Sequence, residues 1–367
     1  MIYYAAYYST EDSGRVKNYA GEDKVDYICQ ALNEIGEEVL IISNAKTLEN
    51  RFAKKEKLHL FQSTNLLYFS SLPRRGIILH AIDVLWGYIQ LVLYVLYNIK
   101  KTDSVIVYHS LGYRGIWGLL RKLKKFNYIL EVEELFQAFD ATKSSYKKKE
   151  RKVFKHPDAF MFSSELLAED INIDNKPSVI INGIYKKEAY LEKIERNIIK
   201  VVYAGSLEKQ KGVDYIIPVA EFLPKEYEIH IIGFGSSDDI KRIEGIIKTT
   251  KGNVSYDGVF KGMAYIDYLQ KCDIGVCIQD ENDVFNRYEY PSKIFSYISN
   301  GLQVIANDLI QLRKSKVFPY LHIVYSKKPQ DIARRIKSCM ENKIDSEDVL
   351  KMLDRNFKEE IQTIIRR

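Results

Sequence analysis

A glycine turn and a lysine early in the second half of the chain have the types and spacing of a phosphate-binding site. Gly205-Ser206-Leu207 directly follows an apolar, strand-like run, and Lys211-Gly212 begins the next helical pattern. Backbone N–H groups in such a turn can approach a phosphate, while a lysine beside a helix N-terminus supplies the opposite charge. Because strand, glycine turn and helix follow one another in every α/β protein, a purely structural turn is the alternative.

Farther along, a second lysine stands where it could meet a bound anion. Pro291 suits the first position of a helix, and this places Ser292 and Lys293 in the first turn, where an anion binds. Tyr288 and Glu289 precede that turn, and a carboxylate there can accept hydrogen bonds from ribose or sugar hydroxyls. An exposed loop carboxylate is the alternative interpretation of Glu289.

Two other motifs are incomplete. Gly233-Phe234-Gly235 lacks the third glycine of G-x-G-x-x-G, which disfavours a nicotinamide-binding fold. The remaining interpretation of this motif is a tight turn at the rim of a cleft. The acidic run that begins at Asp280 lacks the glycine and the terminal glutamate of an EF-hand. The sequence therefore predicts no metal site.

Three carboxylates end a strand-like run in the first half, at Glu131, Glu133 and Glu134. Burying all three together would be costly in free energy. We therefore expect Glu133 or Glu134 to face a cleft, as an acceptor-binding group or a base. A solvent-facing strand edge is the alternative.

Short apolar runs alternate with helical patterns along both halves, which predicts an α/β fold with parallel sheets covered by helices. In the first half, strands are expected at residues 2–6, 38–42, 104–108, 128–132, 159–162 and 179–181. In the second half, they are expected at 201–204, 228–232, 254–256, 274–277 and 303–306. Helices are expected at 24–35, 116–123, 213–221 and 240–248.

The alternation breaks at Gly183, where a polar stretch without a clean period begins. We therefore divide the chain into a Rossmann-like domain at 1–183, a linker at 184–198 and a second Rossmann-like domain at 199–344. A final helix at 345–367 carries one apolar stripe, formed by Val349, Leu353, Phe357, Ile361 and Ile364. Such a helix must dock on another element, and folding back onto the first domain would satisfy it.

Composition bounds the class of protein. The chain has 367 residues, 46% hydrophobic and 28% charged, which excludes a disordered chain or a collagen-like fibre and suggests about two domains. Its four cysteines form no C-x-x-C pair, so neither a zinc site nor a disulfide framework is expected, and a reducing cytoplasm fits. Residues 1–8 are interpreted as a first strand rather than a signal peptide, because no basic leader precedes them.

The charge is mildly basic, with 55 Lys and Arg against 49 Asp and Glu. Basic residues concentrate at 121–125 and 143–155, either as solvated helix faces or as a patch attracted to anionic lipid or a phosphorylated acceptor. Nucleic acid is disfavoured as a partner, since no recognisable nucleic-acid-binding module accompanies the charge.

The apolar stretch 84–97 is too short to span a bilayer. We expect residues 74–101 to form an apolar helix with basic flanks that makes a peripheral contact with an anionic membrane.

Taken together, these motifs resemble those of retaining glycosyltransferases of the GT-B fold, in or near family four, in which two Rossmann-like domains face a central cleft. Four segments that span most of the chain carry the resemblance. Residues 180–184 resemble the V-I-x-N-G strand end before the interdomain crossing, and 204–212 resemble the G-R-L-x-x-x-K-G donor-phosphate loop. Residues 231–235 resemble the following G-x-G turn, and 291–297 resemble the P-x-K-x-x-E-Y helix that holds the nucleotide sugar.

The resemblance implies which residues form the site. Donor-binding residues would be Gly21, Gly205, Ser206, Lys211, Gly235, Tyr288, Pro291, Ser292 and Lys293. In the first half, Gly21 is preferred to Ser13-Gly14 because it directly precedes a predicted helix N-terminus. Catalytic roles would fall on His109, which resembles a histidine beside the transferred sugar, and on Glu289 and Glu133. A lone histidine at a strand end can equally well pack or cap.

The sequence departs from the family pattern at three positions. Ser206 replaces the arginine of the phosphate loop, and Ser296 replaces the second of two glutamates seven residues apart. The first of these glutamates falls on Tyr288, with Glu289 adjacent as its substitute. These departures suggest a rival interpretation, a catalytically inactive GT-B partner subunit of another glycosyltransferase.

The function that the resemblance implies is transfer of a sugar from a nucleotide-sugar donor to a glycan or lipid-linked glycan, in cell-surface polysaccharide or glycoconjugate synthesis. It also implies retention of anomeric configuration, no metal and no cofactor, with a UDP-sugar as the substrate. A cytoplasmic enzyme beside the inner face of the plasma membrane is expected. A nucleotide-sugar epimerase of the same architecture would not need the basic residues of the first half, and the incomplete glycine motif disfavours a dinucleotide oxidoreductase.

Overall fold

The structure, a computed structural model, describes residues 1–17, 19–48, 50–73, 76–108, 115–135, 150–189, 197–280 and 290–365. The chain divides into two compact units. The first unit comprises residues 1–163, 167–184 and 356–367, and the second comprises 164–166 and 185–355.

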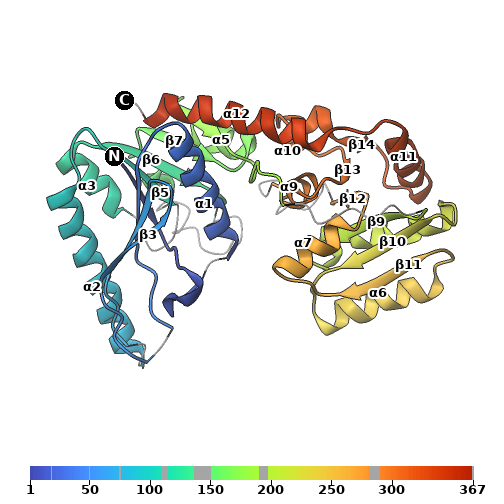
Figure 1. Cartoon of the computed structure of the whole chain (residues 1–367), viewed down its shortest axis with the longest axis horizontal. Helices are drawn as coiled ribbons and strands as arrows, with labels where there is room; N and C mark the ends of the chain where they lie inside the picture. Colours follow the sequence, from blue (N-terminus) through green and yellow to red (C-terminus); the bar gives the residue numbers. More distant parts are fainter. Residues whose placement is uncertain are drawn as a thin grey trace. The chain divides into compact units, whose positions relative to one another are not determined.

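Among the described residues of the first unit, eight strands form one sheet with the order β3-β4-β2-β1-β5-β6-β7-β8 (Figure 1). All neighbouring strands are parallel except β3, which runs antiparallel to β4 at one edge. The strands are β1 Ile2–Ala6, β2 Val39–Ser43, β3 Glu56–Phe61, β4 Thr64–Tyr68, β5 Ser104–Tyr108, β6 Asn127–Val132, β7 Ala159–Phe162 and β8 Ser178–Ile180. Since parallel strands end at the same edge of a sheet, the loops after β1, β5 and β6 emerge on one side.

Helices α1 Tyr19–Glu34, α2 Gly76–Asn98, α3 Ile116–Lys124 and α5 Glu165–Ile171 belong to the first half of the chain. Helix α2 is longer than the apolar stretch 84–97 suggested. It has 23 residues and, by length and composition alone, is the one helix of the described chain that could cross a membrane. The expectation that this segment is too short for that was wrong.

The second unit contains one six-stranded parallel sheet in the described residues, with the order β11-β10-β9-β12-β13-β14. Its strands are β9 Ile199–Ala204, β10 Tyr227–Ile232, β11 Val254–Gly258, β12 Ile274–Cys277, β13 Gln303–Asn307 and β14 His322–Val324. Its helices are α6 Ser237–Thr249, α7 Met263–Gln270, α9 Lys293–Ser299, α10 Ile310–Arg313 and α11 Pro329–Glu341. The buried strands β9, β10 and β12 supply the centre of its apolar core.

The last helix, α12 Ser346–Ile365, ends within the first unit. The apolar stripe predicted from the sequence is buried along its whole length. Phe357 stacks on Tyr27 with 5.8 Å between the ring centroids. Asn127 Nδ2 donates a hydrogen bond of 2.7 Å to the Ile364 carbonyl, so the end of α12 also pairs buried polar groups of the first sheet.

The predicted strands all occur, with ends within two residues of those expected. The segment expected as one helix at 213–221 instead forms two short 3₁₀ helices, Val213–Tyr215 and Ile217–Phe222. Pro218 lies in the second of these, and because proline has no N–H it cannot continue an α-helical ladder. None of the four cysteines, all of which are described and buried, is in a disulfide.

Candidate functional site

In the second unit, the glycine turns after β9 and β10 lie against each other at the carboxyl edge of the sheet. The Gly205 N–H donates to the Ile232 carbonyl over 3.0 Å, and the Leu207 N–H donates to the Phe234 carbonyl over 2.8 Å. Gly205 and Gly233 both have a φ of 142°, which L side chains rarely adopt. A Cβ on Gly233 would overlap the Gly205 carbonyl oxygen. Two glycines are therefore required here, and the absence of side chains lets a ligand approach the backbone closely.

Lys293, the first residue of α9, lies over the Gly205 turn. A Cβ on Gly205 would lie 3.0 Å from the lysine Nζ, so the Lys293 side chain fills the space above this glycine. The Nζ atom is buried and lies 3.8 Å from the centre of the Tyr203 ring. Since a cation over an aromatic face is attracted by the ring quadrupole, Tyr203 helps to hold this charge beside the turn.

Tyr203 also holds the loop between the turn and Lys211. Its hydroxyl donates to the Ser206 carbonyl over 2.6 Å and lies 3.1 Å from the Lys211 carbonyl. Lys211 ends a 3₁₀ helix, Lys209–Lys211, and its side chain is half-buried. One aromatic residue at the end of β9 thus positions both lysine-bearing segments.

The two lysines lie in one region, because Lys293 lies over the Tyr203 ring and the Tyr203 hydroxyl contacts the Lys211 carbonyl. Burial raises the pKa of the Cys277 thiol to about 11, and the charges of Lys293 and Lys211 oppose that increase. Cys277 is the last residue of β12, which pairs directly with β9. Both lysines therefore belong to segments near the carboxyl edge at the middle of this sheet, where doubly wound folds bind ligands.

Tyr297 fixes α9, one turn after Lys293. Its hydroxyl accepts the Ala204 N–H over 2.9 Å, and its ring fills the space left by Gly275 in β12, where a Cβ would overlap the ring. A glycine inside a strand often marks such a close approach. Gly275 was therefore a signal for this contact in the sequence, although the predicted site did not include it.

Two of the three positions that depart from the family pattern, Ser206 and Ser296, lie in this region. The Ser296 hydroxyl is 3.0 Å from the Tyr265 hydroxyl, and the Ser206 hydroxyl accepts the Glu208 N–H over 3.3 Å. Burial raises the pKa of Tyr265, so its phenol stays protonated and uncharged. Neither serine carries a charge. Among the predicted site residues, the cations that the structure places in this region are therefore Lys211 and Lys293.

The remaining predicted donor residues are divided between described and undescribed parts of the chain. Pro291 is buried and Ser292 is exposed at the start of α9. Gly235 packs between Leu207 and Asp239, at a helix start closed by a Ser236–Asp239 capping box. Some predicted features lie outside the described residues, namely His109, Tyr288, Glu289, the linker residues 190–196 and the basic residues 143–149.

In the first unit, the three carboxylates at the end of β6 have different surroundings. Glu131 is fully buried and accepts a hydrogen bond from the Tyr4 hydroxyl. Glu133 is half-buried and pairs with Lys24 of α1, with 2.6 Å between Oε1 and Nζ, whereas Glu134 is exposed. Because Lys24 already matches its charge, Glu133 suits holding a hydroxyl group better than removing a proton. Lys24 was not among the predicted site residues, because its partner is distant in the chain.

Tyr108 ends the neighbouring strand β5 and faces the same acids. Burial raises the pKa of Tyr108 far above its usual value, with further contributions from Glu133, Glu131 and Glu134. Burial, followed by the charge of Glu133, raises the pKa of Glu131 to about 8. Lys24 and the hydrogen bond from Tyr4 lower this pKa, but by less than the first two effects raise it. This sheet edge therefore holds a carboxylic acid that is largely protonated near neutral pH.

Gly21 lies inside α1, because this helix begins at Tyr19 and not near Lys24 as expected. Its neighbour Glu22 accepts hydrogen bonds from the Ser9 N–H over 2.9 Å and from the Ser9 hydroxyl over 2.7 Å. The start of α1 thus carries a carboxylate that ties it to the loop after β1.

Among the described residues, no three His, Cys, Asp or Glu side chains are grouped so that they could hold a metal ion.

We expect Glu131→Gln to change how stability depends on pH. The folded state keeps the Glu131 proton up to about pH 8, whereas the unfolded chain releases it near 4.5. The free energy of unfolding of the wild type should therefore fall as pH rises through this window, by at most about 1.4 kcal/mol per pH unit. Glutamine has no proton to lose, so the variant should lose less stability in urea titrations between about pH 5 and about pH 8.

Glu38→Gln is the matched control for this experiment, since it makes the same chemical change at an exposed position just before β2 of the same sheet. Its pH dependence should equal that of the wild type. If Glu131→Gln and Glu38→Gln follow the same curve, Glu131 does not hold a proton in the folded state.

Comparison with known proteins identifies the fold. No protein-family model matches the chain, and no curated protein matches its sequence. Apo OtsA superposes with a TM-score of 0.67 at 11% identity, over 100% of this chain and 99% of OtsA. The E. coli trehalose-6-phosphate protein bound with UDP-2-fluoro glucose superposes with a TM-score of 0.66 at 12% identity, over 99% of both chains. HepE from Anabaena in complex with UDP gives 0.61 at 10% identity, over 99% of this chain and 98% of HepE.

These structural neighbours are glycosyltransferases of the GT-B fold, and OtsA is a trehalose-6-phosphate synthase. At identities of 10 to 12% the similarity concerns the fold. The chain therefore has the GT-B fold over its whole length, and the fold that its motifs predicted is confirmed.

Proposed function

We propose that this GT-B protein is a glycosyltransferase that moves a sugar from a nucleotide-sugar donor to a glycan or lipid-linked glycan acceptor, in cell-surface polysaccharide or glycoconjugate synthesis. The observation that carries the proposal is the convergence of Lys293, Lys211 and the Gly205 turn around Tyr203, at the carboxyl edge of the second sheet. HepE, a neighbour in fold, has been determined with UDP and with UDP-glucose. We therefore propose a UDP-sugar as the donor.

In the proposed reaction, the two ammonium groups hold the donor diphosphate. As the bond between the sugar and the diphosphate breaks, negative charge grows on the leaving group, and fixed cations stabilise this charge more than that of the intact donor. The buried Nζ of Lys293 acts in surroundings of low dielectric constant, which strengthens the interaction. We propose that the lysines supply this stabilisation without a metal and that the anomeric configuration is retained.

We assign acceptor binding to the edge of the first sheet. Glu133, held by Lys24, can accept a hydrogen bond from a sugar hydroxyl, and the largely protonated Glu131 lies behind it. His109 and Glu289 remain our predicted catalytic residues. A cytoplasmic location fits four cysteines of which none forms a disulfide.

The experiment that tests the proposal is a thermal-shift panel of nucleoside diphosphates and nucleotide sugars, run on the wild type and on Lys211→Ala. We expect UDP and UDP-sugars to stabilise the wild type, by about 2.7 kcal/mol at a concentration 100 times the dissociation constant. The variant should keep its melting temperature, because Lys211 ends a short 3₁₀ helix with a half-buried side chain outside the apolar core, but should lose most of the response. An unchanged response in folded Lys211→Ala would remove this lysine from the site.

A second function is favoured by Ser206 and Ser296, which stand where the family pattern has charged residues. In that case the chain is a GT-B partner subunit without turnover of its own. No response of the wild type to any nucleotide would support this function, and release of UDP from a UDP-sugar by the purified chain would exclude it.

A further inference from the structure

Helix α2 buries only a narrow row of residues and turns many apolar side chains toward the outside. Its buried residues are Asp83, Gly87, Leu91 and Val95, which form a single i, i+4 row. Apolar side chains dominate its exposed surface, among them Ile77, Ile78, Leu85, Leu93 and Tyr97. A surface helix of a globular protein ordinarily carries charged and polar residues on its outer face instead.

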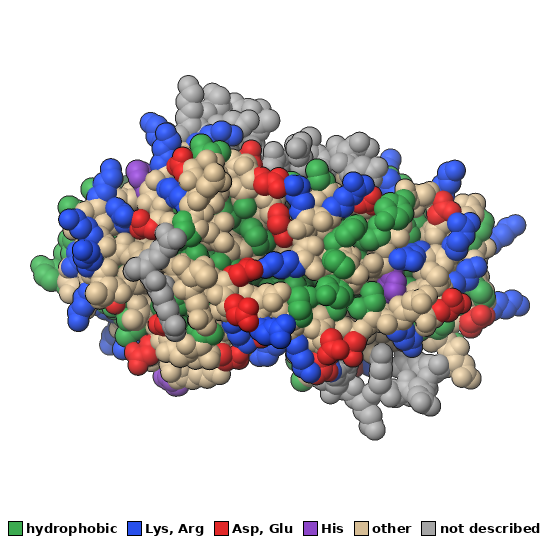
Figure 2. Space-filling view, turned by 90° about the horizontal axis from the view of Figure 1, so that it is seen from above, with side chains coloured by type: hydrophobic (Ala, Val, Ile, Leu, Met, Phe, Trp, Pro, Cys, Tyr) green, Lys and Arg blue, Asp and Glu red, His purple; other side chains and the backbone are tan. Residues whose placement is uncertain are grey.

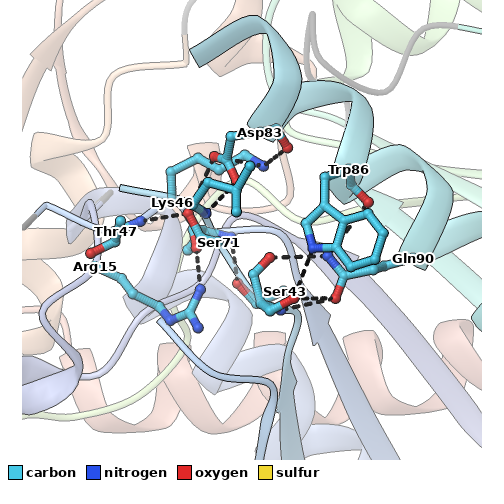
Figure 3. A network of polar contacts seen from close by, with 11 residues as sticks. Arg15, Ser43, Lys46, Thr47, Ser71, Asp83, Trp86 and Gln90 are labelled. Carbon is cyan, nitrogen blue, oxygen red and sulfur yellow. Dashed lines mark hydrogen bonds and ion pairs between the residues drawn. The ribbon is translucent and has the colours of Figure 1, made fainter. Parts of the chain in front are cut away.

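Polar contacts attach this helix to the first unit (Figure 3). Asp83, which is the one residue of α2 among Asp, Glu, Lys and Arg, pairs with Lys46 over 3.2 Å and also accepts hydrogen bonds from neighbouring groups. Gln90 exchanges hydrogen bonds with the Ser70 backbone, with 3.0 Å to its N–H and 3.0 Å to its carbonyl. Gly87 permits a close approach, since a Cβ there would lie 2.8 Å from the Lys46 Nζ. The attachment therefore does not use the apolar side chains on the outer face.

These contacts also limit how α2 can meet a partner. Asp83 and Gln90 tie the middle of the helix to the first unit, and the flanking strands β4 and β5 belong to the same sheet. A helix held along its length in this way cannot cross a bilayer without breaking these bonds. Only its outer face is open, which is the geometry of a helix that lies in the plane of a membrane interface.

Basic side chains border this apolar face. Helix α3 packs beside α2, where Lys124 donates a hydrogen bond of 2.6 Å to the Leu96 carbonyl. Exposed lysines occur just after α2 and on or just after α3, at Lys100, Lys101, Lys122 and Lys125. Figure 2 shows hydrophobic, Lys and Arg side chains gathered at the left end of the view, where α2 and α3 lie in Figure 1.

We propose that the outer face of α2, with the lysines after α2 and on α3, binds the surface of a bilayer that contains anionic lipid. The apolar side chains would enter the boundary between headgroups and acyl chains, while the lysines remain among the negative headgroups. A second copy of the chain could cover the apolar face but would bring like charges together, which disfavours that occupant. The inference is independent of the proposed reaction, because vesicle binding needs neither donor nor acceptor.

The test is flotation of the full chain with vesicles of phosphatidylcholine alone and of phosphatidylcholine mixed with phosphatidylglycerol. We expect binding to both, tighter to the anionic vesicles and weakened by salt there. The triple variant Ile78→Gln, Leu85→Gln, Leu93→Gln should lower the partition coefficient on both vesicles by about tenfold or more. A matched control, Leu48→Gln, Ile173→Gln, Ile310→Gln, changes three other exposed aliphatic residues and should bind as the wild type does.

A second variant separates the charge from the apolar contact. Lys101→Gln, Lys122→Gln, Lys125→Gln should weaken binding to anionic vesicles by roughly 100-fold and leave binding to neutral vesicles unchanged. Circular dichroism should show all variants folded, because the changed side chains are exposed. If the wild type binds neither kind of vesicle, the proposal is overturned. It is also overturned if the wild type forms a dimer that the α2 variant dissociates and does not bind vesicles, because a second copy would then cover the apolar face. Equal loss of binding in the aliphatic control would also overturn it.

Discussion

Replacing Lys293 by methionine should weaken UDP binding by about 10- to 100-fold, the loss expected when a charged hydrogen-bonding partner is removed. The Lys293 Nζ is buried over the Tyr203 ring and beside the Gly205 turn, so its charge lies where the proposed diphosphate binds. Methionine has a similar length and no charge, and it should pack against Tyr203 with little change in melting temperature. Isothermal titration calorimetry with UDP measures the effect.

Lys209→Met is the matched control, since it removes a lysine charge from the exposed face of the neighbouring 3₁₀ helix. Its affinity for UDP should equal that of the wild type. Wild-type affinity in folded Lys293→Met would contradict the donor site proposed for the second unit.

Gly233→Ala should destabilise the second unit by about 2 kcal/mol or more, through strain and overpacking. The backbone at Gly233 has a φ of 142°, and the new methyl group would overlap the Gly205 carbonyl oxygen. The two turns must separate to relieve that overlap, which would move Gly205 away from Lys293. We therefore expect a lower melting temperature together with loss of the UDP-induced shift.

The chain supplies a control for this substitution in Gly245, which lies in α6 with nothing within 4 Å of an added Cβ. Gly245→Ala should be neutral or stabilise the protein by up to about 1 kcal/mol, because alanine favours a helix interior more than glycine does. Equal melting temperatures for the two alanine variants would mean that the turns can separate without cost.

The sequence was sufficient for most of the two sheets because their strands are buried on both faces and read as short continuous apolar runs. The bounds of β1, β5, β7 and β12 were predicted to the residue. Strands β3 and β4 were both missed. Strand β3 is a partly exposed antiparallel edge strand with charged and polar residues among its apolar ones, and β4 begins with two polar residues that leave only a short apolar run. Strand β14 has only three residues, too few for any periodicity to be detected.

The candidate site was predictable where its residues form local motifs, as at Gly205, Lys211 and Lys293. The residues that hold these groups in place were missed because their partners are distant in the chain. Tyr297 contacts Ala204 across 93 positions, and Lys24 pairs with Glu133 across 109. No pattern within a window of local sequence contains such a pair, whereas the fold brings its members together.

Helix α12 has a consequence for how the protein matures on the ribosome. Residues 356–365 belong to the first unit but are translated after the entire second unit. Until they emerge, Asn127 and Ser104 lack their carbonyl partners on Ile364 and Ile365, and Tyr27 lacks the Phe357 ring. The first half therefore cannot complete its native structure co-translationally by itself, although domains generally fold in order from the N-terminus. A nascent chain stalled before these residues would retain an unfinished first unit and become a substrate for chaperones.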